Sequence, residues 1–197
     1  MRKYFLMSVV LFLTFSAANP ARAVPISYTF EGVGTGSLGG TAFTSEQFTI
    51  SVSADTDLVV VPFPGSSLSR TENLAANISF SGGSGGIFTV PTSTVVRRDL
   101  GDIIFGRLDF NLALFSTFRP EYMSYDLISD IGPLTDLNPE IPLNQFSNVP
   151  LDTGLLTFSS IDTITFQAAV VPIPAAVWLF CSGLLGMIGI ARRKKAA

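Results

Sequence analysis

The stretch QFTISVS, residues Gln47–Ser53, alternates apolar and polar residues one by one. Phe48, Ile50 and Val52 would share one face of a strand, and the polar residues between them would share the other face. The stretch DTITFQA, residues 162–168, repeats this pattern. Strict alternation is typical of a β-strand with one buried face and one solvated face.

Shorter apolar stretches predict further strands between residues 24 and 170, and none of them has a convincing helical period. These stretches are ISYTF, DLVVV, NISFS, IFTV, STVVR, DIIF, RLDFNLALF and LLTFSS. Turn clusters separate them, such as FPGSS at 63–67, GGSGG at 82–86 and IGPL at 131–134. The segment from Glu121 to Val149 has less pattern, and we expect long loops there with one helical turn. Together, these short strands and turn clusters predict an all-β fold, an antiparallel two-sheet sandwich of the jelly-roll type.

The first 23 residues have the three-part pattern of a secretory signal peptide. Arg2 and Lys3 give a basic start, and an apolar run follows from Phe5 to Phe15. Ala21 and Ala23 then form the A-x-A pattern of a cleavage site. We expect residues 1–23 to form an apolar signal helix that is removed on export.

The other end of the chain predicts a transmembrane helix. Residues 175–191 contain no charge and no proline, and as a helix they would extend about 25 Å, the short limit for crossing a bilayer. Four basic residues follow and predict a stop-transfer signal on the cytoplasmic side: Arg192, Arg193, Lys194 and Lys195. Ahead of the helix, Pro172 and Pro174 keep the chain extended.

This terminal segment resembles the PEP-CTERM sorting signal of Gram-negative bacteria that export polysaccharide. The resemblance is carried by a Pro-x-Pro motif, the apolar helix and the basic tail, and the motif is Val171, Pro172, Ile173 and Pro174. It implies recognition by an exosortase, an integral-membrane enzyme that cuts near the motif. The most familiar form has glutamate where this chain has Ile173. A permanent membrane anchor is the alternative interpretation of the same residues.

The sequence therefore divides into a signal peptide (1–23), a β-sandwich ectodomain (24–170) and a sorting signal (171–197). The ectodomain contains all 15 acidic residues of the chain, five arginines and no lysine. Such an acidic body repels nucleic acid, so we expect no nucleic-acid partner.

The composition argues against most catalytic mechanisms. The chain has no histidine, and its single cysteine, Cys181, lies in the predicted transmembrane helix. A Ser–His–Asp or Cys–His arrangement and a zinc site of His or Cys ligands therefore cannot form. We expect no catalytic residue, no bound metal and no resident cofactor.

Some residues allow other interpretations. Asp55 with Asp57, and Asp99 with Asp102, could supply oxygen ligands for calcium, although solvated turn acids are commoner. The nearby Tyr122 and Tyr125 could stack on sugars, although packing in the core is commoner for tyrosine. A glycosidase would need two carboxylates flanking a cleft, and the sequence singles out no pair.

Two motifs are expected to be fortuitous. GTGSLG, Gly34–Gly39, fits the dinucleotide fingerprint, but a β pattern follows where a helix is required, and alternate glycines suit a strand face or a hairpin loop. Asn77-Ile78-Ser79 fits a glycosylation acceptor.

We therefore predict an exported, non-catalytic protein of the cell surface or extracellular matrix, associated with exopolysaccharide. It would be anchored transiently in the inner membrane and then processed by exosortase. The alternatives are a carbohydrate-binding module, with or without calcium, and a carboxylate glycosidase.

Overall fold

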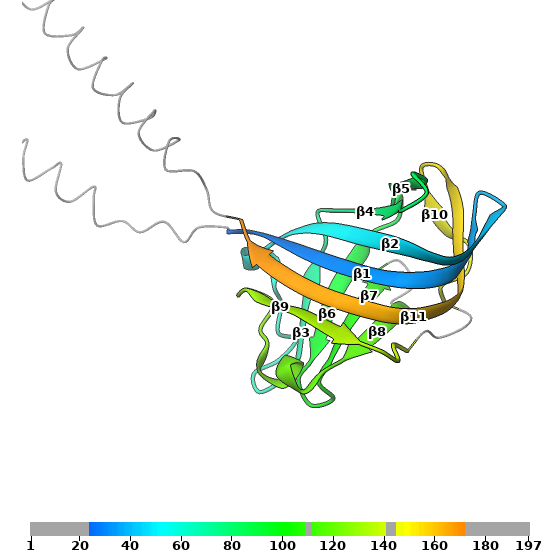
Figure 1. Cartoon of the computed structure of the whole chain (residues 1–197). Helices are drawn as coiled ribbons and strands as arrows, with labels where there is room; N and C mark the ends of the chain where they lie inside the picture. The colour runs from blue at the N-terminus through cyan, green and yellow to red at the C-terminus, as the bar shows by residue number, and fades with distance from the viewer. Residues whose placement is uncertain (1–23, 109–111, 141–144, 172–197) are drawn as a thin grey trace, which may run out of the picture.

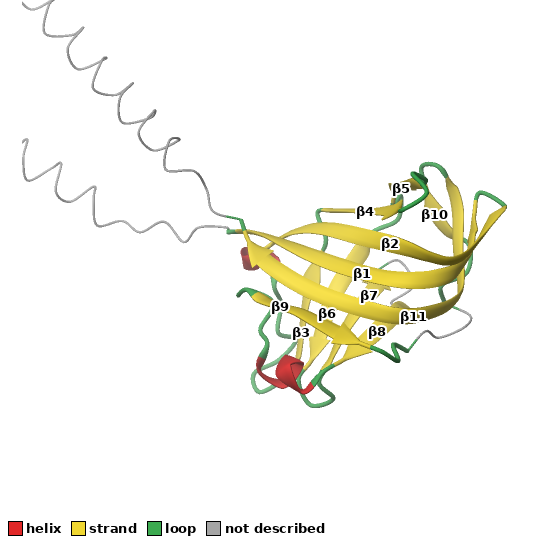
Figure 2. Ribbon diagram, in the orientation of Figure 1, coloured by secondary structure: helices red, strands yellow, loops and turns green. Residues whose placement is uncertain are grey.

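The chain forms an all-β fold of two antiparallel sheets (Figures 1 and 2). This is a computed structural model, and it describes residues 24–108, 112–140 and 145–171. The predicted fold class is confirmed at this level. The predicted signal peptide, the transmembrane helix and the basic tail lie outside the described residues.

The larger sheet has seven strands in the order β10-β11-β1-β2-β4-β5, with β9 also paired to β11. Its strands are β1 (Pro25–Leu38), β2 (Thr41–Asp55), β4 (Ala75–Phe80), β5 (Gly85–Ile87), β9 (Ile131–Asp136), β10 (Val149–Leu151) and β11 (Gly154–Val170).

The smaller sheet has four strands in the order β3-β6-β7-β8. They are β3 (Leu68–Glu72), β6 (Thr92–Arg97), β7 (Asp102–Arg107) and β8 (Leu112–Phe118). Two short 3₁₀ helices, η1 (Thr56–Leu58) and η2 (Pro120–Ser124), complete the described elements.

The two regularly alternating stretches behave as predicted. Phe48, Ile50 and Val52 of β2 are at most 2% exposed. In β11, Ile164 and Phe166 are fully buried. Both strands flank β1 in the larger sheet, so their apolar faces line one continuous layer.

Aromatic rings join the two sheets. The ring of Phe30 in β1 lies 5.6 Å from that of Phe105 in β7 and 5.3 Å from that of Phe115 in β8, between centroids. It also lies 5.0 Å from the ring of Phe166, its neighbour in the larger sheet. Tilted and edge-on contacts of this kind add about 0.5–1.5 kcal/mol per pair to the burial of the rings.

Alternate glycines of β1 make room for these rings. Gly32 pairs with Phe48, and Gly36 pairs with Phe43 and Phe158 on its two sides. A Cβ atom at Gly36 would lie 2.9 Å from the Phe43 ring and 2.0 Å from the carbonyl oxygen of Thr157. The GTGSLG motif is therefore strand up to Leu38, with no helix behind it, and the rejection of a dinucleotide site is supported.

The two ends of the domain lie together at one corner (Figure 1). Ile26 near the start of β1 pairs with Val170 at the end of β11. The backbone N–H of Val171 donates to the carbonyl of Pro25 at 2.8 Å. The chain thus enters and leaves the described domain at adjacent points.

Three predicted strands are wrong. IFTV, residues 87–90, is not a strand, because β5 ends at Ile87 and Phe88 forms only an isolated bridge with Leu151. DLVVV, residues 57–61, holds the last two residues of η1 and then only an isolated bridge between Val60 and Arg70. The helical turn starts there because the Asp55 carboxylate accepts from the backbone N–H of Asp57. RLDFNLALF does not form one strand, since Arg107 ends β7 and Leu112 begins the antiparallel β8.

The segment from Glu121 to Val149 is more ordered than predicted. The helical turn is present as η2, but the IGPL turn cluster lies in a strand, β9. Pro133 is tolerated there because β9 pairs with β11 alone, so its other edge needs no donor. Within the part of the chain that the structure describes, no helix is long and apolar enough to span a membrane.

We predict that Gly36→Ala lowers the free energy of unfolding by about 3 kcal/mol, because the added methyl group meets backbone and must displace β11. Gly82→Ala is the control. Its Cβ would meet only the flexible Glu46 carboxylate, at 2.6 Å, so the loss should stay below about 1 kcal/mol. Urea unfolding followed by circular dichroism measures both. Equal losses would contradict the packing role of the β1 glycines.

Candidate functional site

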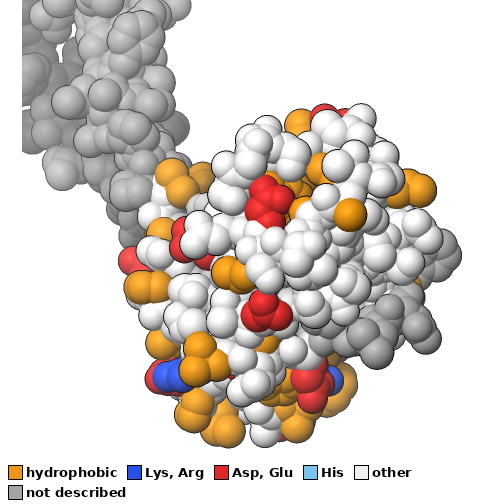
Figure 3. All heavy atoms as spheres, turned by 45° about the vertical axis from the view of Figure 1, so that its right-hand side comes forward, with side chains coloured by type: hydrophobic (Ala, Val, Ile, Leu, Met, Phe, Trp, Pro, Cys, Tyr) orange, Lys and Arg blue, Asp and Glu red, His pale blue; other side chains and the backbone are white. Residues whose placement is uncertain are grey.

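The basic residues of the ectodomain gather around the smaller sheet. Arg70, Arg97 and Arg107 lie on β3, β6 and β7, and Arg98 and Arg119 follow β6 and β8 directly. The strands of the larger sheet carry acidic residues and no basic residue: Glu31, Glu46, Asp55, Asp136 and Asp162. Figure 3 shows a face made mostly of uncharged polar surface with isolated acidic side chains, and basic side chains only near its lower edge.

A groove of about 510 Å³ lies on the outer side of the smaller sheet, and we call it the arginine groove. Ile104 lies in its floor, whereas its neighbours Ile103 and Phe105 are fully buried and point toward the other sheet. Among the residues that the structure describes, three arginines line the groove, Arg70, Arg97 and Arg107, and no acidic residue does.

Pairing across the strands creates this arrangement. Arg70 is opposite Val95, and Val95 is opposite Ile104, so the three side chains stand in one row. Beside β3, Val60 exchanges two backbone hydrogen bonds with Arg70, of 2.7 and 3.0 Å, and adds an apolar wall. The groove therefore combines an aliphatic floor with cationic sides.

Arg97 is held by a buried carboxylate. Its Nε donates to both carboxylate oxygens of Asp102, at 2.9 and 3.1 Å, and its Nη2 also bonds to Oδ2. Asp102 is fully buried, while the Arg97 side chain is 36% exposed. The hydrogen bond to Asp102 is the main reason why the pKa of Arg97 is raised above its ordinary value.

The arginines differ in their bonding. Among the described residues, the Arg70 side chain has no hydrogen-bond or ion-pair partner. Arg98 donates to the Ser69 hydroxyl at 2.7 Å and to the carbonyl of Ser66 at 2.8 Å. Arg119 forms an exposed ion pair with Glu121. Arg70 is therefore the groove arginine best placed to take an anionic ligand.

The residues considered for calcium have other contacts. Asp55 begins η1, and Asp102 pairs with Arg97. Asp57 lies beside Asp55 through its backbone N–H, which donates to the Asp55 carboxylate at 2.9 Å, and Asp99 is exposed. The described residues contain no group of three or more acidic, His or Cys side chains that could hold a metal ion.

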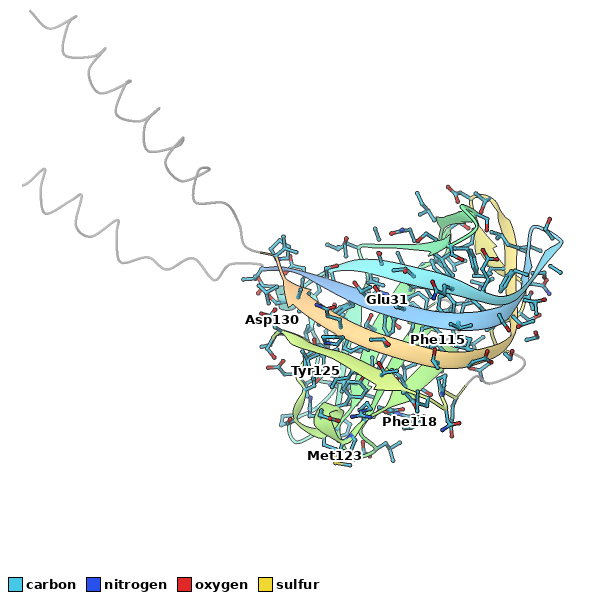
Figure 4. The ribbon with its side chains drawn as sticks, viewed as in Figure 1. Glu31, Phe115, Phe118, Met123, Tyr125 and Asp130 are labelled. Carbon is cyan, nitrogen blue, oxygen red and sulfur yellow. The ribbon has the colours of Figure 1, made fainter. Side chains whose placement is uncertain are left out.

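Tyr122 and Tyr125 belong to the core and are not exposed sugar platforms. They are 0% and 3% exposed, and their rings meet Phe166 edge-on (Figure 4 labels Tyr125). Tyr28 stacks on the same ring, and its hydroxyl donates to the carbonyl of Leu127 at 2.6 Å. The Tyr125 hydroxyl is buried without a hydrogen-bond partner among the described residues.

The other candidate residues from the sequence lie on β4, at the end of the domain or outside the described residues. Asn77 and Ser79 lie on β4, so the glycosylation pattern falls in a strand rather than a loop. Val171 of the sorting motif is exposed at the end of the domain. The other predicted site residues lie outside the described residues: Ala21, Ala23, Pro172, Ile173, Pro174, Arg192, Arg193, Lys194 and Lys195.

No pattern in the sequence predicts the arginine groove. Its three arginines come from separate strands, and no local motif connects them. The one available signal was that all five arginines of the ectodomain fall between residues 70 and 119. Comparison with protein-family models, curated proteins and solved structures gives no match to the chain.

We predict that Arg97→Gln lowers the free energy of unfolding by about 2 kcal/mol, because it leaves the Asp102 carboxylate buried without its cation; the value allows for the partial exposure of Arg97. Arg119→Gln removes the same charge from an exposed pair and should barely move the urea midpoint. If both variants unfold at the same urea concentration, Arg97 does not stabilise the buried carboxylate of Asp102.

We also predict that stability falls as the pH rises above about 10. Burial is the main cause that raises the pKa of Tyr28, Tyr122 and Tyr125 far above the ordinary value. Above pH 10 the unfolded chain releases tyrosine protons that the folded chain retains, so unfolding becomes more favourable. The ectodomain has no lysine or cysteine that would titrate in the same range.

Two phenylalanine variants test this pH effect. Tyr125→Phe removes an unpaired buried hydroxyl, so it should weaken the alkaline loss and stabilise the fold at pH 7 by about 1 kcal/mol. Tyr28→Phe breaks a hydrogen bond and should instead destabilise the fold at pH 7 by about 1 kcal/mol. Urea titrations at pH 7 and pH 11 measure both effects. An unchanged alkaline loss in Tyr125→Phe would contradict the assignment.

Proposed function

We propose that this chain is an exported, non-catalytic protein of the cell surface or extracellular matrix, sorted through its C-terminal segment by an exosortase and associated with exopolysaccharide. The proposal rests first on the residues that resemble a PEP-CTERM signal. In this proposal residues 175–191 hold the protein transiently in the inner membrane, and cleavage near the motif releases it.

The observation that carries the proposal is the place where the domain ends. Among the described residues, the last backbone hydrogen bond along the chain joins Val171 to Pro25, and the Pro-x-Pro motif begins with the next residue. A cut in or beyond the motif would remove no strand of either sheet. The domain could therefore fold before cleavage and stay intact after it.

The same corner also suits export at the other end. β1 begins at Pro25, one residue beyond the predicted signal cleavage between Ala23 and Val24. Removal of residues 1–23 would likewise leave every described strand complete. Both proposed cleavages thus fall just outside the hydrogen-bonded domain.

The finer part of the fold proposal is a sandwich of the jelly-roll type. It is supported by the aromatic contacts between the sheets and by a chain that passes from one sheet to the other four times, after β2, β3, β5 and β8.

A carbohydrate-binding module is the second candidate, and the arginine groove is the observation that favours it. The calcium-assisted version has no support from the contacts of Asp55 and Asp102. A carboxylate glycosidase is less favoured. Among the described residues, the arginine groove has no acidic lining residue, and two other hollows have one each, Glu31 and Glu46.

We predict that the protein recovered outside the cell lacks residues 175–197 when a working exosortase is present, because the apolar helix would otherwise keep it in the membrane. Mass spectrometry of both termini, in strains with and without the exosortase, measures this. Replacing both Pro172 and Pro174 with alanine should leave the tail uncut, whereas replacing Ala196 and Ala197 with serine should not. An intact tail outside a strain with active exosortase would refute the sorting proposal.

A further inference from the structure

We propose that the arginine groove binds a polysaccharide that carries carboxylate groups, as chains containing uronic acid residues do. This names the ligand class for the matrix association proposed above and rests on it. It does not depend on the sorting or cleavage of the C-terminal segment.

The charges of the groove select an anionic ligand. Arg70, Arg97 and Arg107 line it, and no acidic residue does within residues 24–108, 112–140 and 145–171. A guanidinium group can donate two parallel hydrogen bonds to one carboxylate, which makes arginine the side chain best suited to this group. The Arg70 side chain is available for such a contact, and the bonds between Arg97 and Asp102 engage only Nε and Nη2, so Nη1 can still donate.

The floor of the groove selects a ligand that also has an apolar face. Val95, Ile104 and Ala113 supply aliphatic surface. Gly106 leaves the floor low, and a Cβ atom there would lie 2.8 Å from the carbonyl oxygen of Leu112. A uronic acid ring combines a face of C–H groups with a carboxylate at its edge, so it can pack on the floor while its carboxylate reaches an arginine.

The backbone around the groove disfavours an acidic peptide. All four strands of the smaller sheet are paired, and β3 is further paired with Val60 at its outer edge. On the other edge, the backbone of Ser116 in β8 pairs with that of Glu140. An extended peptide would therefore find few free N–H and C=O groups to join by strand addition.

The acidic charge of the whole ectodomain does not prevent such binding. Screening limits charge interactions at the surface to about 8 Å at physiological ionic strength. The basic residues lie around the smaller sheet, and Glu31 and Asp162 lie on the larger one. The strands of the smaller sheet carry two acidic residues. Asp102 is paired with Arg97, and Glu72 does not line the groove.

The test compares polygalacturonate with its fully methyl-esterified form, which has the same backbone and no free carboxylate. The full chain, purified in a neutral detergent, is run in affinity gels that contain one polymer or the other. We expect polygalacturonate to retard the protein, the ester to leave it unretarded, and added NaCl to weaken the retardation. Equal retardation by both polymers would overturn the proposal.

Variants locate the binding site. Arg70→Gln should weaken binding to polygalacturonate about tenfold, because a charge-assisted hydrogen bond is lost. Val95→Glu keeps every arginine but places an acid in the floor, and it should weaken binding similarly. Arg119→Gln is the matched control, with the same loss of charge outside the groove, and it should bind within about twofold of the parent chain. Circular dichroism and the urea midpoint verify that each variant is folded.

Other outcomes would also overturn the proposal. These are an equal loss in Arg119→Gln, and tighter binding to polyglutamate or to vesicles of anionic phospholipid than to polygalacturonate. Concentration-dependent dimerisation that Arg70→Gln abolishes would assign the groove to a second copy of the chain. If the tail is cut normally but no polyuronate binds, this inference fails alone. If polyuronate binds but the tail stays uncut, only the sorting proposal fails.

Discussion

The ring of Phe30 lies between the two sheets and touches the rings of Phe105, Phe115 and Phe166. A domain without disulfides depends chiefly on burial of this kind to offset the entropy of ordering its chain. The contact in turn constrains β1, the strand that carries Phe30. Further along β1, alternate glycines lack a side chain, and aromatic rings of the adjacent strands pack against the backbone there. One end of β1 therefore contributes an aromatic ring to the core, and the other end leaves space for the rings of its neighbours. Glycine normally weakens a strand, but here the rings of adjacent strands cover the gap it leaves.

The central position of β1 also determines where the chain ends lie. Because β1 pairs with β11 along nearly its whole length, the first and last strands of the domain share one ladder. The ends therefore meet at the corner where Pro25 accepts a hydrogen bond from Val171. Any segments attached before and after the domain must start from this corner. The remaining surface, including the outer sides of both sheets, is left for other contacts.

The sequence predicted those parts of the fold that are encoded locally. QFTISVS and DTITFQA were correctly predicted because each alternates within one strand that is buried on a single face. RLDFNLALF alternates equally well, yet its ends belong to two strands, since periodicity cannot detect a reversal of the chain. β9 was missed because Gly132 and Pro133 are strong turn signals, which an edge strand tolerates. The arginine groove could not be predicted, because it depends on which residues of β3, β6 and β7 stand opposite each other. That register is set by tertiary pairing and not by any local pattern.

The separation of charge follows from the same architecture. Each sheet has one face in the core, so the two outer faces are free to differ in charge without affecting the packing. The outer face of the larger sheet carries uncharged polar residues and a few carboxylates. The smaller sheet places Arg97 beside Asp102, where a fully buried carboxylate holds a guanidinium group at the surface. Arg70 stands one strand away with no described partner. A lone cation contributes little to stability, and Val95 and Ile104, which share its row in the groove, are aliphatic. Folding alone gives no reason for this arrangement, whereas a carboxylated ligand does.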